Sequence, residues 1–148
     1  VDVRPMGRTA RGVRGIKMGD EYRMIALIIP QNNRQILTVS ENGYGKRTKV
    51  EDFPVYGRGG QGVIGIQTND RNGSVVGAVQ VLDADEIMLI SDKGTLVRTR
   101  VKEVSVQGRN TMGVRLIRLK EGEKLVGLEQ VDEPPDEEND QASSEEIK

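Results

Sequence analysis

The ten residues Gly57–Ile66, GRGGQGVIGI, decide the fold because the chain contains them three times in related form. Gly7–Ile16 reads GRTARGVRGI, and Gly108–Ile117 reads GRNTMGVRLI. Each copy has Gly-Arg, three variable residues, Gly-Val and an apolar residue at the tenth place, and we refer to the three segments as the Gly-Arg boxes. Successive boxes lie 50 and 51 residues apart. A period of this length is typical of a propeller-like or solenoid array of repeated units.

The repeat extends beyond the Gly-Arg boxes. Ile36–Val55 aligns without gaps on Ile87–Val106 at an offset of 51, which places Gly43 on Gly94. The apolar runs are rich in Val, Ile and Thr and are separated by Gly, Asn and Asp, as β-hairpins require. Asn42-Gly43 in particular predicts a tight turn in which both residues tolerate positive φ. The predicted strands are about Gly12–Met18, Met24–Ile29, Gln35–Ser40, Tyr44–Val50, Gly62–Thr68, Val75–Leu82, Glu86–Ser91, Thr95–Val101, Gly113–Leu119 and Lys124–Val131.

Four short strands in each unit of about 50 residues are typical of a propeller blade or a related fold. We therefore predict an all-β domain of about two and a half blades over residues 1–131, with repeats at about 7–56, 57–107 and 108–131. Two and a half blades cannot close a ring without leaving unpaired strand edges, so we expect the chain to be part of a longer array. Residues 132–148 hold eight acidic residues and one basic residue, which predicts a disordered acidic tail.

Composition limits the chemistry that this chain offers. There is no Cys and no His among the 148 residues, which excludes a disulfide framework and most nucleophile–base arrangements. The three tyrosines, Tyr22, Tyr44 and Tyr56, lie in no recognisable activating context. Trp is absent and there is one Phe, so we expect an aliphatic core. No apolar run approaches the roughly 18 residues that span a membrane, so we expect a cytoplasmic location. Because Cys and His are absent and the tyrosines have no activating context, we expect no catalysis by this chain alone.

The acidic residues Asp83, Asp85 and Glu86 form a cluster between two predicted strands. Carboxylates in this arrangement are able to hold a hard cation. Asp is also an ordinary turn residue, so the alternative is a solvated loop, which we favour.

The first 131 residues carry 21 bases and 15 acids, which makes the predicted domain basic. Arg47 and Lys49 are two residues apart on a predicted strand and so share one face, and Arg98 and Arg100 repeat this pair 51 residues later. A charged strand face is often a solubility device or an edge protection. Repeated at equal intervals, however, it suits the regular line of phosphates in duplex DNA. The predicted DNA-binding residues are Arg8, Arg11, Arg14, Lys46, Arg47, Lys49, Arg58, Arg98, Arg100, Lys102, Arg109 and Arg115.

The chain contains VDVRPMGRTARGVRGIK from Val1, ENGYGKRT from Glu41, NGSVVGAVQV from Asn72, GTLVRTRV from Gly94 and GRNTMGV from Gly108. These five segments resemble the C-terminal domain of the bacterial DNA gyrase A protein, and the resemblance covers Val1 to about Val131. It implies a β-pinwheel, a propeller-like ring with strands exchanged between blades, whose basic perimeter wraps duplex DNA. It further implies a type II DNA topoisomerase that introduces negative supercoils in an A2B2 assembly with the gyrase B protein, associated with the bacterial nucleoid. The ATP and Mg²⁺ of that assembly act through other domains, and no cofactor is expected in this chain.

The resemblance leaves alternatives. Tyr56–Gly62, YGRGGQG, is a degenerate copy of the family's Q-R-R-G-G-K-G box, so we expect the complete box upstream of this chain. The C-terminal domain of the topoisomerase IV A protein is a near relative. A protein-binding propeller, of the regulator-of-chromosome-condensation type, has repeats of similar length. A further hypothesis is that the acidic residues near Asp136 compete with DNA for the basic surface.

Overall fold

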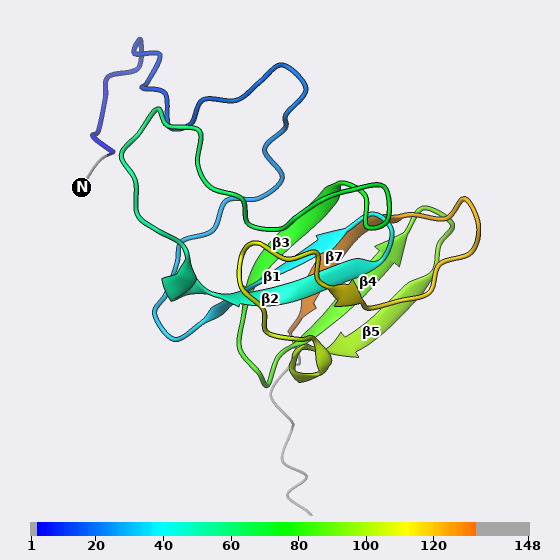
Figure 1. The fold of residues 1–148 in the computed structure, drawn as a ribbon. Coiled ribbons are helices and arrows are strands. Elements are labelled where there is room, and N and C mark those ends of the chain that lie inside the picture. Colours follow the sequence, from blue (N-terminus) through cyan, green and yellow to red (C-terminus); the bar gives the residue numbers. More distant parts are fainter. Residues whose placement is uncertain (1–2, 133–148) are drawn as a thin grey trace, which may run out of the picture.

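Antiparallel β-strands build this chain, as the computed structural model shows for residues 3–132 (Figure 1). The all-β class is therefore confirmed, and residues 3–132 contain no α-helix. The predicted tail lies, from residue 133 onward, outside the described residues. The strands are β1 (Gln35–Ser40), β2 (Tyr44–Lys49), β3 (Val75–Val81), β4 (Glu86–Ser91), β5 (Leu96–Arg100), β6 (Val114–Arg115) and β7 (Leu125–Val131), with 3₁₀ turns η1 (Val50–Asp52) and η2 (Val101–Glu103).

The strands form two sheets, and equivalent positions of the sequence repeat occupy equivalent strands in them. One sheet has the order β3-β1-β2-β6, and the other has the order β5-β4-β7. The offset of 51 places β1 on β4 and β2 on β5, so the hairpin β1–β2 and the hairpin β4–β5 are equivalent. Even the irregularities match, because the register shifts at Val39/Ser40 in one sheet and at Ile90/Ser91 in the other. The predicted repeat is thus a repeat of three-dimensional structure.

One repeat does not correspond to one blade. The four-stranded sheet takes β1 and β2 from the first unit, β3 from the second and β6 from the third. In the three-stranded sheet, β4 of the second unit pairs with β5 of the same unit and with β7 of the third. The simple assignment of four consecutive strands to one blade is therefore wrong. Strand exchange between blades, which the resemblance implied, is the arrangement that the chain adopts.

This exchange explains which predicted strands are missing. Residues 12–18, 24–29 and 62–68 form no strand and contribute only an isolated bridge between Ile16 and Gly60. The second strand of a unit pairs with the third strand of the unit before it, as β3 does with β1. The first strand of a unit pairs with the fourth strand two units earlier, as β6 does with β2. Residues 3–132 contain no such partners for the segments 12–18, 24–29 and 62–68. A strand without a partner would leave its backbone groups unpaired.

The core lies between the two sheets and is aliphatic, as predicted. Each sheet contributes fully buried side chains to it, for example Leu37 and Val39 from β1 and Ile87 and Leu89 from β4. Burial of each such side chain stabilises the fold by about 1.5–3 kcal/mol. The remaining members of the cluster are Val81, Val101, Val104 and Leu125.

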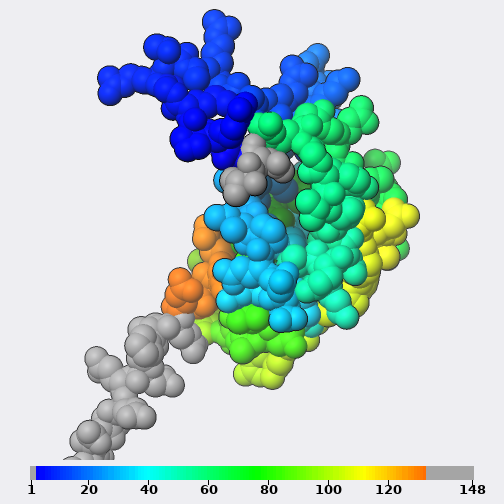
Figure 2. Space-filling model, turned by 90° about the vertical axis from the view of Figure 1, so that its left-hand side faces the viewer, coloured from blue at the N-terminus to red at the C-terminus, as the bar shows by residue number. Residues whose placement is uncertain are grey.

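The N-terminal segment extends away from the sheets. Residues 3–27 are exposed along their whole length, and Figure 2 shows the blue end of the chain projecting beyond the body. Apolar side chains such as Met24 and Leu27 are 67% and 87% exposed. Within residues 3–132, no helix is long and apolar enough to cross a membrane.

Candidate nucleic-acid interface

Most of the cations that the sequence analysis assigned to DNA lie on the surface. Arg109 is half-buried, whereas Lys46 and Arg47 are buried. The remaining nine are exposed: Arg8, Arg11, Arg14, Lys49, Arg58, Arg98, Arg100, Lys102 and Arg115.

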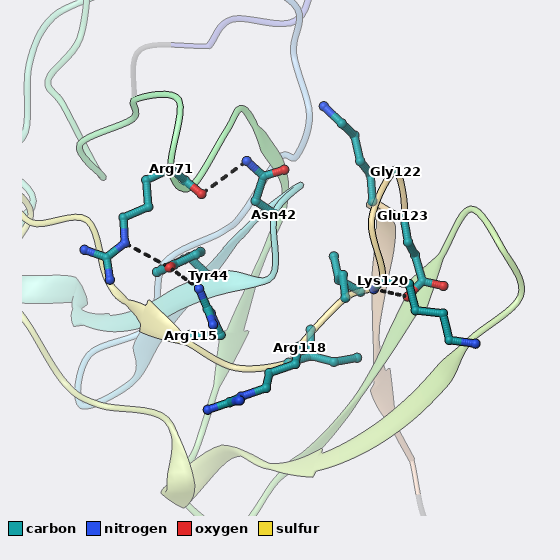
Figure 3. A pocket seen from close by; sticks show the side chains of 11 residues that line it. Asn42, Tyr44, Arg71, Arg115, Arg118, Lys120, Gly122 and Glu123 are labelled. Carbon is teal, nitrogen blue, oxygen red and sulfur yellow. Dashed lines mark hydrogen bonds between the residues drawn. The ribbon is translucent and has the colours of Figure 1, made fainter.

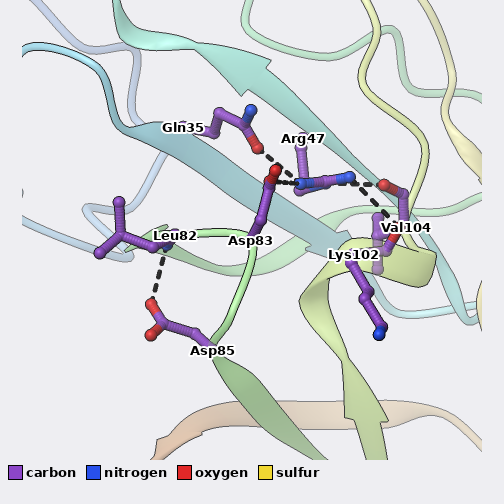
Figure 4. Close-up of polar contacts among 7 residues, drawn as sticks. All are labelled: Gln35, Arg47, Leu82, Asp83, Asp85, Lys102 and Val104. Carbon is purple, nitrogen blue, oxygen red and sulfur yellow. Dashed lines mark hydrogen bonds and ion pairs between the residues drawn. The ribbon is translucent and has the colours of Figure 1, made fainter.

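Arg47 does not lie on the exposed cationic face that the sequence predicted. Its side chain is 7% exposed and points into the fold, where Nε donates to the carbonyl of Val104 at 2.7 Å and Nη1 donates to Gln35 Oε1 at 2.8 Å (Figure 4). Nη1 also pairs with the carboxylate of Asp83. The cause is the segment that follows η2, because it covers the outer edge of β2. The backbone N–H of Arg47 donates to the carbonyl of Ser105 at 2.9 Å, and the backbone N–H of Gln107 donates to the carbonyl of Arg47 at 2.8 Å. The prediction that Arg47 faces DNA is therefore wrong.

The prediction that Lys46 binds DNA is also wrong, because its side chain has no exposed surface. Its Nζ donates to the carbonyls of Gly108 and Arg109, both at 2.6 Å, and to Thr111 Oγ1 at 3.1 Å. Burial lowers the pKa of Lys46 to about 8, and the nearby Arg109 guanidinium acts in the same direction. Lys46 thus fastens the third Gly-Arg box onto the first hairpin and does not face a partner.

The second hairpin keeps the alternation that the sequence predicts. Along β5 the exposed residues are Leu96, Arg98 and Arg100, and the residues between them are half-buried. Arg98 pairs with Glu86, and Arg100 Nε lies 3.8 Å from the other oxygen of the same carboxylate. The shared face of Arg98 and Arg100 is therefore confirmed. Their contact with DNA stays a prediction.

Lys49 and Arg100 are equivalent residues with equivalent surroundings. Each is exposed, ends the fourth strand of its unit, and precedes a 3₁₀ turn. Their backbones match, with φ/ψ of −62/139° at Lys49 and −74/132° at Arg100. The repeat therefore presents a cation at the same structural place in successive units.

The Gly-Arg boxes pack against one another in a repeated way. The backbone N–H of Lys17 donates to the carbonyl of Gly60 at 2.8 Å, and that of Gln67 donates to Thr111 at 2.9 Å, which is the same contact one unit later. The glycines at the sixth place of each box all have positive φ, as expected for a structural role: 79° at Gly12, 77° at Gly62 and 79° at Gly113.

The box arginines differ in what they contact. Arg109 donates from Nε to the carbonyl of Asp52 at 2.8 Å and from Nη1 to that of Ile64 at 3.1 Å. These bonds hold the third box beside η1, and so bring Arg109 and Lys49 to one end of the first hairpin. Arg58 lines a pocket of about 480 Å³ between the first and second boxes.

The acidic cluster offers little to a metal ion. Asp83 pairs with Arg47, Glu86 pairs with Arg98, and Asp85 Oδ2 accepts from the backbone N–H of Leu82 at 2.8 Å. Among the described residues, no group of three or more acidic side chains is placed to hold a metal ion. These carboxylates serve as partners of the protein's own cations and turns.

Sequence reasoning missed a cluster around Tyr44. The Tyr44 hydroxyl accepts hydrogen bonds from Arg71 Nε and Arg115 Nη2, both at 3.0 Å (Figure 3). These bonds, Arg71 first and then Arg115, lower the pKa of the Tyr44 phenol although burial opposes them. Arg71 carried no signal in the sequence, because it occupies a loop and only the fold brings it to β2.

The strand exchange, the repeated hairpins and the stacked boxes define a β-propeller-type domain. A family described as "DNA gyrase C-terminal domain, beta-propeller" matches residues 1–31, 34–81 and 85–132. The DNA gyrase A protein of Pseudomonas aeruginosa is 61% identical over 132 residues, which are 89% of this chain and 14% of that protein. The DNA gyrase A protein of Salmonella typhimurium is 60% identical over 136 residues, or 92% of this chain and 16% of that protein.

The chain belongs to the DNA gyrase C-terminal domain family. Among solved structures, "Structure of DNA gyrase A C-terminal domain" matches with a TM-score of 0.73 and 32% identity, over 87% of this chain and 44% of that one. "Crystal structure of the C-terminal domain of DNA topoisomerase IV" has a TM-score of 0.79 at 21% identity, over 88% and 41% of the two chains, and shows a shared fold. The chain thus spans about a seventh of the length of the two curated relatives.

Proposed function

We propose that this chain is part of a non-catalytic module that binds duplex DNA without sequence preference and wraps it. The observation that carries the proposal is the equivalence of Lys49 and Arg100, which are exposed in the same backbone geometry one repeat apart. An array of such units carries cations at regular intervals along its perimeter, and duplex DNA carries phosphates at regular intervals along its backbone.

Wrapping needs many such contacts. Smooth bending of a 20–30 base-pair site by 40–90° costs on the order of 1–6 kcal/mol. Individual exposed cations contribute little, so the favourable energy has to come from numerous phosphate contacts along the path. The exposed arginines of the first two boxes, such as Arg8 and Arg58, add to the strand-end cations.

The proposal extends to the protein that carries this chain. We infer that it is a DNA gyrase A protein that acts with the gyrase B protein in an A2B2 complex in the bacterial cytoplasm. In this role the module presents wrapped DNA for strand passage, so that ATP-dependent negative supercoiling results. ATP and Mg²⁺ serve other domains of the complex, and the 45–61% identity to curated gyrase A proteins supports this inference.

The test uses the full-length protein with Lys49→Glu and Arg100→Glu combined. We expect weaker binding to duplex DNA, a shallower dependence of affinity on salt, and loss of negative supercoiling with relaxation retained. The matched single variants Arg100→Glu and Lys93→Glu reverse one charge at opposite ends of the hairpin β4–β5, both at exposed sites. The strand-end variant should have the larger effect, because Lys93 lies at the turn and bonds to the Glu121 carbonyl.

Other functions give other results. A protein-binding propeller has no salt-sensitive affinity for duplex DNA, with or without the substitutions. For a component of topoisomerase IV, the double variant should impair decatenation instead of negative supercoiling. Unchanged supercoiling by a folded double variant would contradict the wrapping proposal itself.

A further inference from the structure

A pocket of about 440 Å³ opens beside Tyr44, where the loop that carries Arg71, the start of β2, the strand β6 and residues 117–124 meet. Its lining contains a single carboxylate, that of Glu123. Five cations line the pocket: Arg71, Arg115, Arg118, Lys120 and Lys124. The pocket is therefore strongly positive.

Two of these cations are fixed on the tyrosine. The guanidinium carbons of Arg71 and Arg115 lie 5.5 and 5.4 Å from the centroid of the Tyr44 ring, within range of cation–π attraction. Both groups also donate to the phenol oxygen, and Figure 3 shows them turned toward it. Tyr44 itself is only 5% exposed, so it is a rigid anchor for two like charges.

The surrounding structure holds this arrangement in place. Asn42 Nδ2 donates to the carbonyls of Asp70 and Arg71, both at 3.2 Å, and so fixes the loop that carries the Arg71 side chain. Arg115 lies opposite Tyr44 in the pairing of β2 with β6. The pocket is thus preorganised, and a ligand need not order it.

The carboxylate of Glu123 does not neutralise the two guanidinium groups. Its oxygens accept from Thr95 Oγ1 at 3.0 Å, Ser91 Oγ at 3.2 Å and the backbone of Lys120 at 3.4 Å. Burial opposes ionisation of Glu123, but these bonds together lower its pKa and keep it engaged with the protein.

The donors of the cluster exceed its acceptors. Because the Tyr44 oxygen accepts two bonds, its own O–H remains a donor, and each guanidinium keeps further N–H groups. Among the described residues, neither Arg71 nor Arg115 forms an ion pair with a carboxylate. Lys124, in contrast, lies 3.3 Å from Glu41. Two adjacent guanidinium groups without a counter-charge form a site for an anion with several oxygens.

We propose that this pocket binds one phosphate of the DNA backbone between Arg71, Arg115 and the Tyr44 hydroxyl. The proposal rests on the proposed function, since it adds a defined phosphate position to the path of the duplex. Guanidinium groups match phosphate because their planar forks donate parallel hydrogen bonds to two oxygens. Arg118 is exposed and lines the same pocket, so it adds positive charge beside the site. Such a contact fixes the position of the duplex and carries no sequence information.

The first experiment measures duplex DNA affinity against salt for the full-length protein with Arg71→Gln and Arg115→Gln combined. Loss of charge-assisted hydrogen bonds to one phosphate should weaken binding by at least about tenfold. The slope of log affinity against log salt should fall by about one. Lys93→Gln is the control, because it removes an exposed cation outside the pocket. Arg71→Lys keeps the charge and should retain the slope. It should lose affinity, because an ammonium group cannot donate the two parallel hydrogen bonds of a guanidinium.

The second experiment titrates inorganic phosphate and follows Tyr44. The difference in ultraviolet absorbance between the full-length protein and its Tyr44→Phe variant, followed against pH, reports the phenol of Tyr44. Bound phosphate offsets the two guanidinium charges, so the phenol should ionise at higher pH in its presence. This readout does not depend on DNA and requires the folded pocket, so it also detects a variant that has merely unfolded.

The outcomes separate the two proposals. If the wild type binds DNA and the double variant keeps the same affinity and slope, the pocket proposal fails and the proposed function stands. If phosphate moves the Tyr44 titration but DNA binding is unaffected by the substitutions, the pocket is a site for free phosphate and the assignment to DNA is wrong. If the wild type shows no salt-dependent DNA affinity, the proposed function is wrong, and the assignment of the Tyr44 pocket to a DNA phosphate is wrong as well.

Discussion

The hairpins β1–β2 and β4–β5 have equivalent sequences, equivalent registers and the same glycine at the turn, yet they differ in burial. In β2 the residues Tyr44 to Thr48 are all buried, whereas β5 alternates between exposed and half-buried residues. The side chain of Arg47 is 7% exposed, and that of its counterpart Arg98 is 46% exposed. The difference arises from neighbours, since Ser105–Gln107 and β6 cover the outer edge of β2. No described residue covers that edge of β5.

The comparison shows that a repeated cation need not have a repeated role. Arg47 joins the first hairpin to the segment after η2, which belongs to the following unit, while Arg98 pairs within its own hairpin. The same residue type at the same repeat position is thus a structural link in one place and a surface cation in the other. Lys49 and Arg100, at the strand ends, are both exposed, so this difference between the two hairpins does not extend to them.

The largest expected difference between the hairpins follows from Arg47→Met and Arg98→Met. Arg47→Met leaves the Val104 carbonyl and the Gln35 amide without their donor, so it should lower the free energy of unfolding by about 4 kcal/mol. Arg98→Met removes an exposed ion pair and should cost about 1 kcal/mol or less. Urea denaturation of both variants measures the difference. Equal losses would mean that the cover on β2 does not persist in solution.

The turn glycines give a second matched pair. Gly43 and Gly94 have φ of 83° and 82°, so alanine is strained equally at both positions. A Cβ at Gly43, however, would lie 2.7 Å from the carbonyl oxygen of Ile117, and one at Gly94 would meet nothing within 4 Å. We expect Gly43→Ala to cost about 3 kcal/mol and Gly94→Ala about 1 kcal/mol. Thermal unfolding of the two variants gives the order, and a reversed order would refute the packing of residue 117 on the first turn.

These turns also show what the sequence could predict. Asn42-Gly43 marked the hairpin correctly, but the turn needs positive φ only at Gly43, because a three-residue loop separates the strands. Strand positions and the aliphatic core followed from local alternation and composition, which are properties of short segments. The residues 24–29 have the same local pattern as β3 and form no strand, because pairing depends on a partner elsewhere in the chain.

The candidate interface was predictable only in part for the same reason. Exposure of Arg100 followed from alternation, whereas burial of Lys46 and Arg47 depends on a segment about 60 residues away. The Tyr44 pocket joins residues 27 and 71 positions apart, and no short pattern contains them. Charge patterning therefore predicts which face of a strand is basic, and the packing of neighbouring units decides whether that face meets solvent.

A smaller effect is expected from Lys46, whose counterpart in the second hairpin is Val97. Lys46→Met removes the donor that the carbonyls of Gly108 and Arg109 share, so we expect a loss of about 2 kcal/mol in the free energy of unfolding. Val97→Lys at the second hairpin meets no Gly-Arg box and should be close to neutral. Hydrogen exchange of the amides in residues 108–113 provides the local readout, since the third box should open more often in Lys46→Met alone.

A measurement against pH separates the charge of Lys46 from its packing. Burial lowers the pKa of Lys46 from 10.5 to about 8, so between these values the unfolded chain binds more protons than the folded one. The free energy of unfolding should therefore rise as pH increases through that window, and the charged form contributes its full cost below about pH 8. Lys46→Met should lack this rise, and urea denaturation at about pH 7 and about pH 9.5 compares the two proteins. A rise that persists in Lys46→Met would assign the titration to another group and would leave the buried ammonium without an energetic cost.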